Sequence, residues 1–252
     1  MSQATHIIRF LAQEDNRIHL GQLVDPTRNV GLDSYDGKEI KAYLINGSLY
    51  NPEVTKHVYT VKTLLSPVSK EDCNYIRCLG LNYKDHAADG TSDYEAELAV
   101  VIGKDGRDIP EAKALEYILG YTASNDVSAR ALQMTTSQWG FSKGLDGSCP
   151  LGPVLVTKDA IPDPQTLGIK AIYNGRTVKD GNTKDMIFTI AKQISYLSQG
   201  TTLEAGTVIL TGTPAGIGYF REPRVVLEDG GDIRIEIENI GTLVNKVRYE
   251  EW

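Results

Sequence analysis

The chain is poor in the residues that mark several common classes of protein. Its 252 residues include only three cysteines, too few and too scattered for a disulfide framework or a zinc site. We therefore expect Cys73, Cys78 and Cys149 to be buried free thiols in a reducing compartment. Basic residues are outnumbered as well, with 26 Lys and Arg against 33 Asp and Glu. The resulting net charge of −7 argues against nucleic acid as a partner, because nucleic acid requires a basic face.

Targeting, membrane and nucleotide-binding signals are also missing. No apolar run reaches the length of about 18 residues that a membrane span needs. Residues 1–21 lack the apolar core of a signal peptide and carry acids that a transit peptide would avoid. This predicts a cytoplasmic protein, with a mitochondrial location as the alternative. Neither a Gly-x-Gly-x-x-Gly pattern nor a glycine loop ending in Gly-Lys-Ser/Thr is present, so no phosphate-binding loop is expected.

Short strands dominate the patterns that are present. Residues 6–11 and 17–24 read as two strands joined by a polar turn, and residues 40–70 continue as short segments up to Ser66-Pro67. Further strand patterns cover residues 75–83, 94–103, 171–178, 207–214 and 233–241. Three segments read as helices, residues 111–118, 128–136 and 186–199.

Because strands outnumber helices and most turns are short, the pattern favours a β-rich α+β fold over a doubly wound α/β fold. The front section, residues 1–70, is predicted to form a small β-containing lobe. Residues 71–252 then form the main domain, which carries the candidate functional residues.

Two glutamates open the most apolar strand pattern, residues 94–103. Glu95 and Glu97 are two positions apart, so on a strand their side chains point to the same face. They lie about 7 Å apart, a gap that one cation with ligand distances of about 2.1 Å can bridge. Two solvated glutamates at an exposed strand end are the alternative.

A second polar group follows where a strand is predicted to run into a helix. Asp126, Arg130 and Gln133 have the spacing i, i+4, i+7, which places them on one helical face. A carboxylate beside an arginine suits a metal ligand next to a clamp for a substrate carboxylate, because arginine binds carboxylates bidentately. The alternative is a helix cap with an Arg–Asp pair on a surface helix. Oxygen ligands indicate Mg²⁺, Mn²⁺ or Ca²⁺ rather than zinc.

Three further segments carry weaker signals. His86 is one of four histidines and reads equally as a structural residue. Lys143 lies in a semi-apolar stretch, where a charge needs a partner, unless it is a solvated loop lysine. Residues 210–218 form a glycine-rich loop that could offer backbone N–H groups and hydroxyls to an anion, or serve as a plain turn.

Taken in order, six motifs of the chain resemble those of the fumarylacetoacetate hydrolase family. The resemblance runs from about residue 74 to the C-terminus. It implies a mixed β-roll with flanking helices, in a protein that is usually a homodimer. The end of the chain is similar to the eukaryotic branch of acylpyruvate hydrolases and oxaloacetate tautomerases, and the front section resembles fungal members. The motifs are residues 80–87, 93–104, 120–130, 138–153, 173–188 and 210–218.

The resemblance also implies roles for individual residues. Three carboxylates match the family's ligands for Mg²⁺ or Mn²⁺, with Ca²⁺ as a possible substitute. A histidine matches the general base, and a lysine is a second catalytic candidate. Four polar residues match the substrate site, among them the threonine that receives a substrate carboxylate. In that order, these residues are Glu95, Glu97 and Asp126; His86; Lys143; and Tyr83, Arg130, Gln133 and Thr213.

One departure from the family pattern lies between His86 and Glu95. Members of the family carry some thirty or more residues there, including a lid and a glutamate three positions after the histidine. In this chain Ala88 is followed almost directly by the Asp93–Glu97 motif, and Asp89 stands where that glutamate would be. A true deletion would replace or remove the acid that orients His86, and the site would exclude water less well.

These patterns lead to three functional hypotheses. The first is a metal-dependent hydrolase that cleaves a C–C bond of an acylpyruvate-type diketo acid through a stabilised enolate. The second is a tautomerase or decarboxylase of oxaloacetate. The third is a catalytically silent dimeric binding protein, which the short segment after His86 would favour. The sequence leaves the substrate, the metal and the reaction type open.

Overall fold

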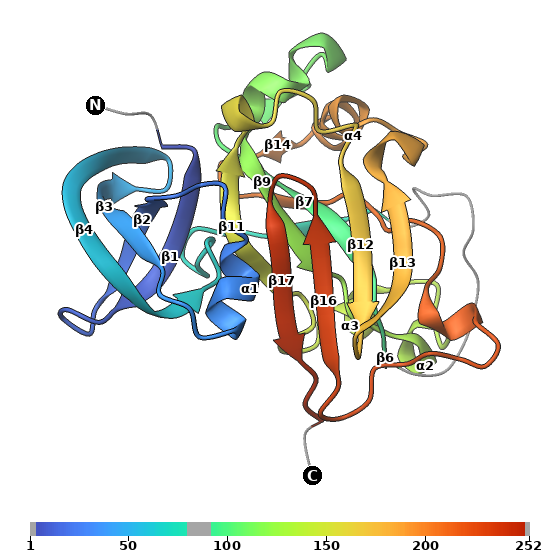
Figure 1. The fold of residues 1–252 in the computed structure, drawn as a ribbon. Coiled ribbons are helices and arrows are strands. Elements are labelled where there is room, and N and C mark those ends of the chain that lie inside the picture. The colour runs from blue at the N-terminus through green and yellow to red at the C-terminus, as the bar shows by residue number, and fades with distance from the viewer. Residues whose placement is uncertain (1–3, 80–91, 250–252) are drawn as a thin grey trace.

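The computed structural model describes residues 4–79 and 92–249 and has the β-rich α+β architecture expected from the sequence (Figure 1). Within these residues nine strands form the largest sheet. In sheet order they are β2 (Ile18–Leu23), β3 (Lys41–Ser48), β4 (Asn51–Leu65), β1 (His6–Ala12), β11 (Leu151–Thr157), β9 (Ile118–Asn125), β7 (Ala96–Ile102), β15 (Val208–Leu210) and β5 (Ile76–Cys78).

A second, antiparallel sheet packs across the centre of the first (Figure 1). Its strands, in sheet order, are β13 (Arg176–Asn182), β12 (Gly168–Tyr173), β16 (Asp232–Ile237) and β17 (Gly241–Lys246). Alternate residues of β12 and β16 point into the main core, where Ile169, Ala171, Ile233 and Ile235 are buried. This period-2 burial is what a sheet with one covered face requires.

Short elements complete the described part of the chain. Two small ladders join β6 (Ser92–Asp93) to β10 (Ser128–Ala129) and β8 (Gly106–Arg107) to β14 (Thr202–Leu203). The α-helices are α1 (Val30–Tyr35), α2 (Arg130–Gln133), α3 (Gly140–Lys143) and α4 (Ile190–Leu197). The 3-10 helices are η1 (Glu111–Tyr117), η2 (Lys158–Ala160), η3 (Thr183–Asp185) and η4 (Gly218–Phe220).

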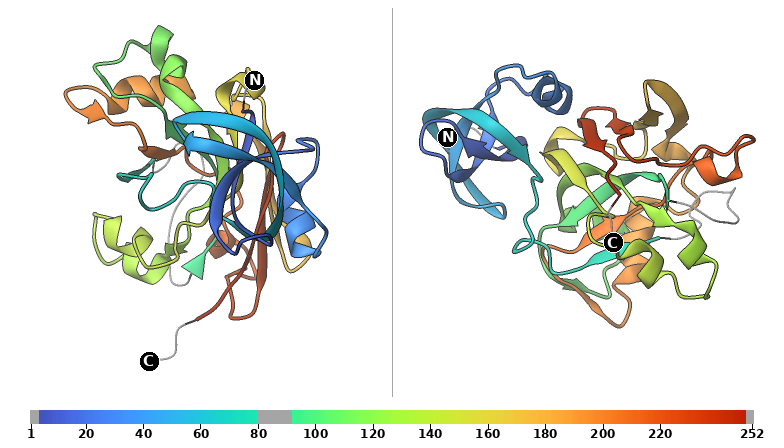
Figure 2. Two further views of the ribbon diagram at one scale, coloured as in Figure 1. Left: turned by 90° about the vertical axis from the view of Figure 1, so that its left-hand side faces the viewer. Right: turned by 90° about the horizontal axis from the view of Figure 1, so that it is seen from below.

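The front section curls into a small lobe at one side of the molecule (Figures 1 and 2). Strand β2 pairs with both β3 and β1, so the four strands β1–β4 close on themselves. Strand β1 also pairs with β11, which joins the lobe to the main sheet. Helix α1 packs against β17, where the Asn29 amide donates to Thr242 Oγ1 at 2.8 Å. A domain boundary at residue 70 stays a prediction.

Three elements differ from the sequence-based expectations. Residues 171–178, read as one strand, are the hairpin β12–β13, because Asn174 and Gly175 both adopt the positive φ of a tight turn. Residues 40–70 are not all short segments, since β4 alone runs for 15 residues. The predicted helices are shorter than expected, and the one at 111–118 is a 3-10 helix.

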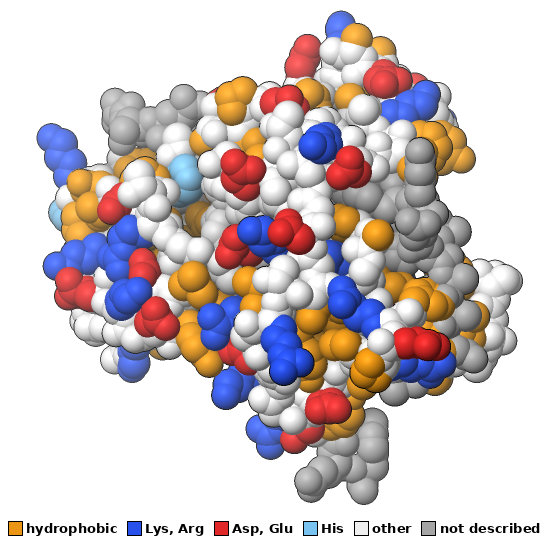
Figure 3. Space-filling view, turned by 45° about the vertical axis from the view of Figure 1, so that its right-hand side comes forward, with side chains coloured by type: hydrophobic (Ala, Val, Ile, Leu, Met, Phe, Trp, Pro, Cys, Tyr) orange, Lys and Arg blue, Asp and Glu red, His pale blue; other side chains and the backbone are white. Residues whose placement is uncertain are grey.

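Acidic and basic side chains are interspersed over the molecular face in Figure 3. Among the described residues, no helix is both long and apolar enough to cross a membrane.

Candidate functional site

Strand β7 divides its side chains between two environments. Leu98 and Val100 point into the main core under the second sheet. Ala99 and Val101 point the other way, into a smaller cluster on the opposite face of the large sheet. Glu97 shares the parity of Ala99, so it lies on that second face, as does Glu95 just before the strand. The sequence alternation thus places both glutamates on one side, as expected.

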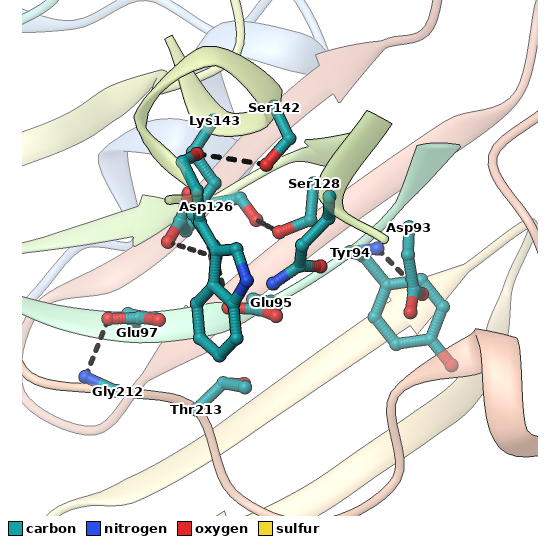
Figure 4. A network of polar contacts seen from close by, with 12 residues as sticks. Asp93, Tyr94, Glu95, Glu97, Asp126, Ser128, Ser142, Lys143, Gly212 and Thr213 are labelled. Atoms are coloured by element: carbon teal, nitrogen blue, oxygen red, sulfur yellow. Dashed lines mark hydrogen bonds and ion pairs between the residues drawn. The ribbon is translucent and has the colours of Figure 1, made fainter. Parts of the chain in front are cut away.

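Asp126 joins the two glutamates because β9 is the direct neighbour of β7. The register pairs Ala96 with Asn125, which brings the end of β9 beside the start of β7. The Asp126 N–H donates to the Glu95 carbonyl at 2.9 Å. One carboxyl oxygen from each of Glu95, Glu97 and Asp126 lies within 4.8 Å of the others, and all three residues are buried (Figure 4). We call these three residues the acidic triad.

The helical-face interpretation of Asp126 is wrong in its local detail. Residues Ser128 and Ala129 are extended and pair with β6, so helix α2 begins only at Arg130. Asp126 therefore lies in the connection after β9 rather than on the helix. Asp126 comes near Arg130 because the connection after β9 and helix α2 both lie beside β6 and β7. Their proximity is therefore a tertiary contact and does not come from helical spacing.

Burial and mutual repulsion of the three carboxylates raise the pKa values of two of them. Burial, followed by the charges of Asp126 and Glu95, raises the pKa of Glu97 well above its usual range. Burial also raises the pKa of Asp126 to about 6, against the opposing charge of Lys143. For Glu95 the charges of Lys143 and Arg130 outweigh burial and lower its pKa to about 2.

Lys143 supplies positive charge directly at the triad. Its ammonium nitrogen lies 2.9 Å from Glu95 Oε2 and 2.6 Å from Asp126 Oδ2, and its side chain is 13% exposed. Although burial lowers the pKa of Lys143, the three carboxylates outweigh burial and raise it. Lys143 is thus a cation here, and the lowered pKa that a lysine base would need is not found.

Arg130 is occupied mainly by protein acceptors. Its Nε and Nη2 donate to Asp93 Oδ2 at 3.1 and 3.0 Å, and Nη2 also lies 2.7 Å from Glu95 Oε1. Its Nη1 donates to Gln133 Oε1 at 2.8 Å. Four of its five N–H bonds are therefore used within the described residues, which leaves no bidentate fork for a substrate carboxylate. The same contact turns the Gln133 NH₂ group away from Arg130.

Asp93 is a site residue to which the sequence analysis assigned no role. It is fully buried, and it accepts hydrogen bonds from the Gly218 and Tyr219 N–H groups at 2.9 and 3.2 Å as well as from Arg130. A signal was available, since Asp93, Glu95 and Glu97 occupy positions i, i+2 and i+4 and so share one face of an extended chain.

The glycine-rich loop after β15 does bind anions, but the anions found are the protein's own carboxylates. The Gly212 N–H donates to Glu97 Oε2 at 2.7 Å, and the N–H groups at the loop's end hold Asp93. Thr213 is buried beside the triad (Figure 4). Its Oγ1 accepts a hydrogen bond from the Lys179 ammonium at 2.5 Å. Lys179 was not recognised from the sequence, because one lysine in a short strand carries no signal of burial.

Two predicted site residues, Tyr83 and His86, lie outside the described residues, as does Asp89. The cysteines form no disulfide, as expected, but none is fully buried. Cys73 and Cys149 are half-buried, and Cys78 is exposed. The expectation of three buried thiols is therefore wrong, because Cys73 and Cys149 only flank the smaller apolar cluster and Cys78 is exposed.

The residues fit a hard divalent cation. The triad offers three carboxylate oxygens, the ligand type that Mg²⁺ and Mn²⁺ prefer. Among the described residues Lys143 pairs with Glu95 and Asp126, whereas Glu97 makes no ion pair. The raised pKa of Glu97 marks a deficit of positive charge that such a cation would correct. Fold and site thus define a β-rich protein with a buried carboxylate cluster suited to a metal ion.

Comparison with known proteins identifies the family of the chain. The family profile described as fumarylacetoacetate (FAA) hydrolase C-terminal matches residues 87–248. Caffeoylpyruvate hydrolase of Neonothopanus nambi is 38% identical over 98% of this chain and 94% of that protein. Oxaloacetate tautomerase YisK of Bacillus subtilis is 34% identical over 92% of this chain and 97% of that protein. The chain belongs to the fumarylacetoacetate hydrolase family.

A solved structure extends this likeness to the fold. The 2-hydroxyhepta-2,4-diene-1,7-dioate isomerase of Mycobacterium marinum matches with a TM-score of 0.81 and 29% identity, over 98% of this chain and 100% of that one. Since these relatives are named for the reactions they catalyse, the chain is an enzyme of this family, and the catalytically silent reading is not supported.

The relatives carry residues that this chain lacks. The alignment with the N. nambi protein runs over 289 positions, more than the 252 residues of the chain. Gaps of that size agree with the short segment noted between His86 and Glu95.

Proposed function

We propose that this enzyme is a divalent-metal-dependent hydrolase that cleaves the C–C bond of an acylpyruvate. The observation that carries the proposal is the acidic triad, in which Glu97 faces two other carboxylates without an ion pair among the described residues. The reaction class is supported by the similarity to caffeoylpyruvate hydrolase over nearly the whole of both chains.

The triad Glu95, Glu97 and Asp126 would hold Mg²⁺ or Mn²⁺. The bound ion would polarise the 2-oxo and carboxylate oxygens of the substrate and stabilise the negative charge of the enolate. The Gly212 N–H and the Lys143 ammonium orient the triad carboxylates, because each already contacts one or two of them.

In the proposed reaction, His86 accepts a proton from water as the water oxygen adds to C4 of the acylpyruvate. The C3–C4 bond then breaks, and its electron pair stays on C3 of the pyruvate half as the enolate. A proton returned to C3 gives pyruvate, and the acyl half leaves as a carboxylic acid. In this proposal Thr213 and the Gln133 NH₂ group would donate hydrogen bonds to substrate oxygens, and Lys143 would provide positive charge near the acidic triad.

A second candidate is oxaloacetate tautomerisation or decarboxylation. It is favoured by the similarity to the B. subtilis tautomerase, which also extends over nearly all of both chains. Both reactions need the same stabilised enolate, so the described site serves either one.

The substrate test separates these functions by product. The Mg²⁺ form is incubated with acetylpyruvate, fumarylpyruvate, caffeoylpyruvate and oxaloacetate, and the products are followed by NMR. Pyruvate and a carboxylic acid in equal amounts support hydrolysis. Faster interconversion of enol and keto oxaloacetate without loss of carbon supports tautomerisation, and release of CO₂ supports decarboxylation. The homodimer implied by the resemblance is checked by light scattering of the purified chain.

A further inference from the structure

A second lysine lies deeper in the molecule than Lys143. Lys179, on β13, is only 3% exposed, although β13 is an edge strand of the second sheet. Its ammonium nitrogen donates to Thr213 Oγ1 at 2.5 Å and to the Pro214 carbonyl at 2.6 Å. A buried ammonium is costly without such acceptors, so these two contacts are what allow a lysine at this position.

The surrounding backbone holds Lys179 and the Thr213 loop in close register. A Cβ added to Gly181, two residues after Lys179 on β13, would lie 2.8 Å from the Pro214 side chain. On the other side of Lys179, the Val178 carbonyl accepts a hydrogen bond from the Arg221 guanidinium. Strand β13 is therefore held on both sides of the lysine, by the Thr213 loop at Gly181 and by Arg221 at Val178.

Charged groups of the site face Lys179. Burial is the largest influence and lowers its pKa to about 8, while Glu95, Asp93 and Glu97 favour its charged form and Arg130 opposes it. Lys179 is thus within electrostatic reach of the triad but forms no ion pair with it among the described residues, because its hydrogen bonds go to the neutral oxygens of Thr213 and Pro214. At neutral pH it adds a positive charge beneath the loop that carries Thr213.

We propose that Lys179 is a positioning residue that orients Thr213 for binding a substrate carboxylate beside the acidic triad. An ammonium can only donate, so Thr213 Oγ1 must accept from it, and the hydroxyl hydrogen of Thr213 must point in another direction. The neighbouring Gly212 N–H donates to Glu97 Oε2, so the backbone before Thr213 is held beside a proposed metal ligand, while Lys179 holds the hydroxyl. This inference rests on the proposed function, in which Thr213 receives that carboxylate.

Ligand binding tests the role without requiring the right substrate. Oxalate, a planar mimic of the pyruvate enolate, is titrated into the Mg²⁺-loaded protein by calorimetry, and Mg²⁺ alone is titrated separately. In Lys179→Met we expect the Kd for oxalate to rise about 10-fold or more, as for the loss of a charge-assisted hydrogen bond. The Kd for Mg²⁺ should stay unchanged or fall, because a positive charge near the triad has been removed. Lys184→Met, an exposed lysine just after β13, is the matched control.

A double-mutant cycle shows whether Lys179 acts through Thr213. If it does, Lys179→Met combined with Thr213→Val should bind oxalate no more weakly than Thr213→Val alone. Additive losses would overturn the proposal, as would an unchanged oxalate Kd in Lys179→Met. A parallel loss of Mg²⁺ and oxalate binding would also overturn it, since that pattern indicates a general structural role.

Lys179→Gln provides a second variant if Lys179→Met does not fold, because the glutamine amide can donate to one of the two acceptors. If neither folds, the pH dependence of oxalate binding to the unmodified protein tests the role. The affinity should fall as the pH rises through the Lys179 pKa, which burial lowers to about 8 in the metal-free protein. A flat profile between pH 7 and 9 would then overturn the proposal. If the enzyme converts none of the tested substrates, the oxalate and Mg²⁺ titrations still test the role of Lys179, because they do not require turnover.

Discussion

The ammonium nitrogen of Lys143 lies 2.6 Å from Asp126 Oδ2, although the two residues are 17 positions apart along the chain. The contact joins helix α3 to the end of β9 and places one cation among three buried carboxylates. The charge of one lysine does not balance three carboxylates. Glu97 makes no ion pair within the described residues, and its pKa stays raised. This imbalance leads to the first two predictions.

Replacing Glu97 by glutamine should separate metal binding from fold stability. Glu97→Gln removes a like charge, so the metal-free variant should melt at the same temperature as the unmodified protein or higher. It should also lose most of the rise in Tm that Mg²⁺ produces, because a ligand is missing. Thermal melts with Mg²⁺ and with EDTA measure both effects.

Glu39→Gln is the control, since that glutamate is 65% exposed and far from the triad in sequence. If Glu97→Gln kept the full Mg²⁺-dependent rise in Tm, Glu97 would not be a metal ligand.

The metal-free enzyme should become less stable as the pH rises from about 4 to about 6. The Asp126 pKa is raised to about 6 when folded, against an ordinary value of 3.8, so the folded state binds more protons in this range. The free energy of unfolding should therefore fall with rising pH, by on the order of 2–3 kcal/mol from this group. Urea denaturation in EDTA at pH 4.5 and 7 measures the difference.

Two comparisons test this assignment. Asp126→Asn should reduce the pH dependence, and saturating Mg²⁺ should abolish or reverse it, because the metal requires the ionised carboxylate. Glu97 acts in the same direction as Asp126, whereas Glu95, whose pKa is lowered from 4.5 to about 2, acts in the opposite direction and mostly below pH 4.5. A stability that increases from pH 4.5 to 7 in EDTA would contradict the prediction.

Asp93→Asn should destabilise the fold through Arg130. Asp93 is fully buried and accepts from the guanidinium and from two N–H groups of the glycine-rich loop. Removing its charge leaves Arg130 with one carboxylate partner and should cost about 3–5 kcal/mol of unfolding free energy. Urea denaturation measures this, with Asp146→Asn at an exposed loop position as the control. A loss below 1 kcal/mol would show that the ion pair is not needed for stability.

Oxalate should raise the Tm only when a divalent ion is present. Its two carboxylates chelate a metal, whereas the described triad by itself is acidic and repels an anion. Melts with oxalate plus Mg²⁺, oxalate plus EDTA, and Mg²⁺ alone distinguish chelation from direct binding. An equal shift in EDTA would mean that oxalate binds through the lysines and arginine without the metal.

His86→Ala should affect turnover and little else. If His86 is the general base, its loss should lower kcat by about 10²–10⁴-fold on a confirmed substrate. Mg²⁺ affinity and Tm should stay nearly unchanged, because His86 is not among the proposed ligands. Full turnover in this variant would show that a group other than His86 accepts the proton from water. Lys143 is a poor candidate for that role in the metal-free protein, because the triad raises its pKa.

Local sequence determined the pair of glutamates on one face of β7. Side chains alternate along any extended chain, so Glu95 and Glu97 share a face whatever the rest of the fold does. The same rule applies to Asp93, although its role was missed. The β-rich character was also predictable, since apolar alternation and turn residues are local properties. The Asn174-Gly175 turn was equally visible in the sequence but was read as part of one strand.

The partners of these carboxylates depended on tertiary structure. Arg130 was expected to face a substrate, yet Asp93 and Glu95 occupy most of its donors once β6 and β10 pair. Lys179 is buried only because the loop after β15 packs onto β13, more than thirty positions further along the chain. The exposure and charge state of a lysine depend on the residues that surround it in space. The local sequence of a short strand does not predict those neighbours. Side-chain direction is thus set by neighbours along the chain, whereas ion pairing is set by elements brought together on folding.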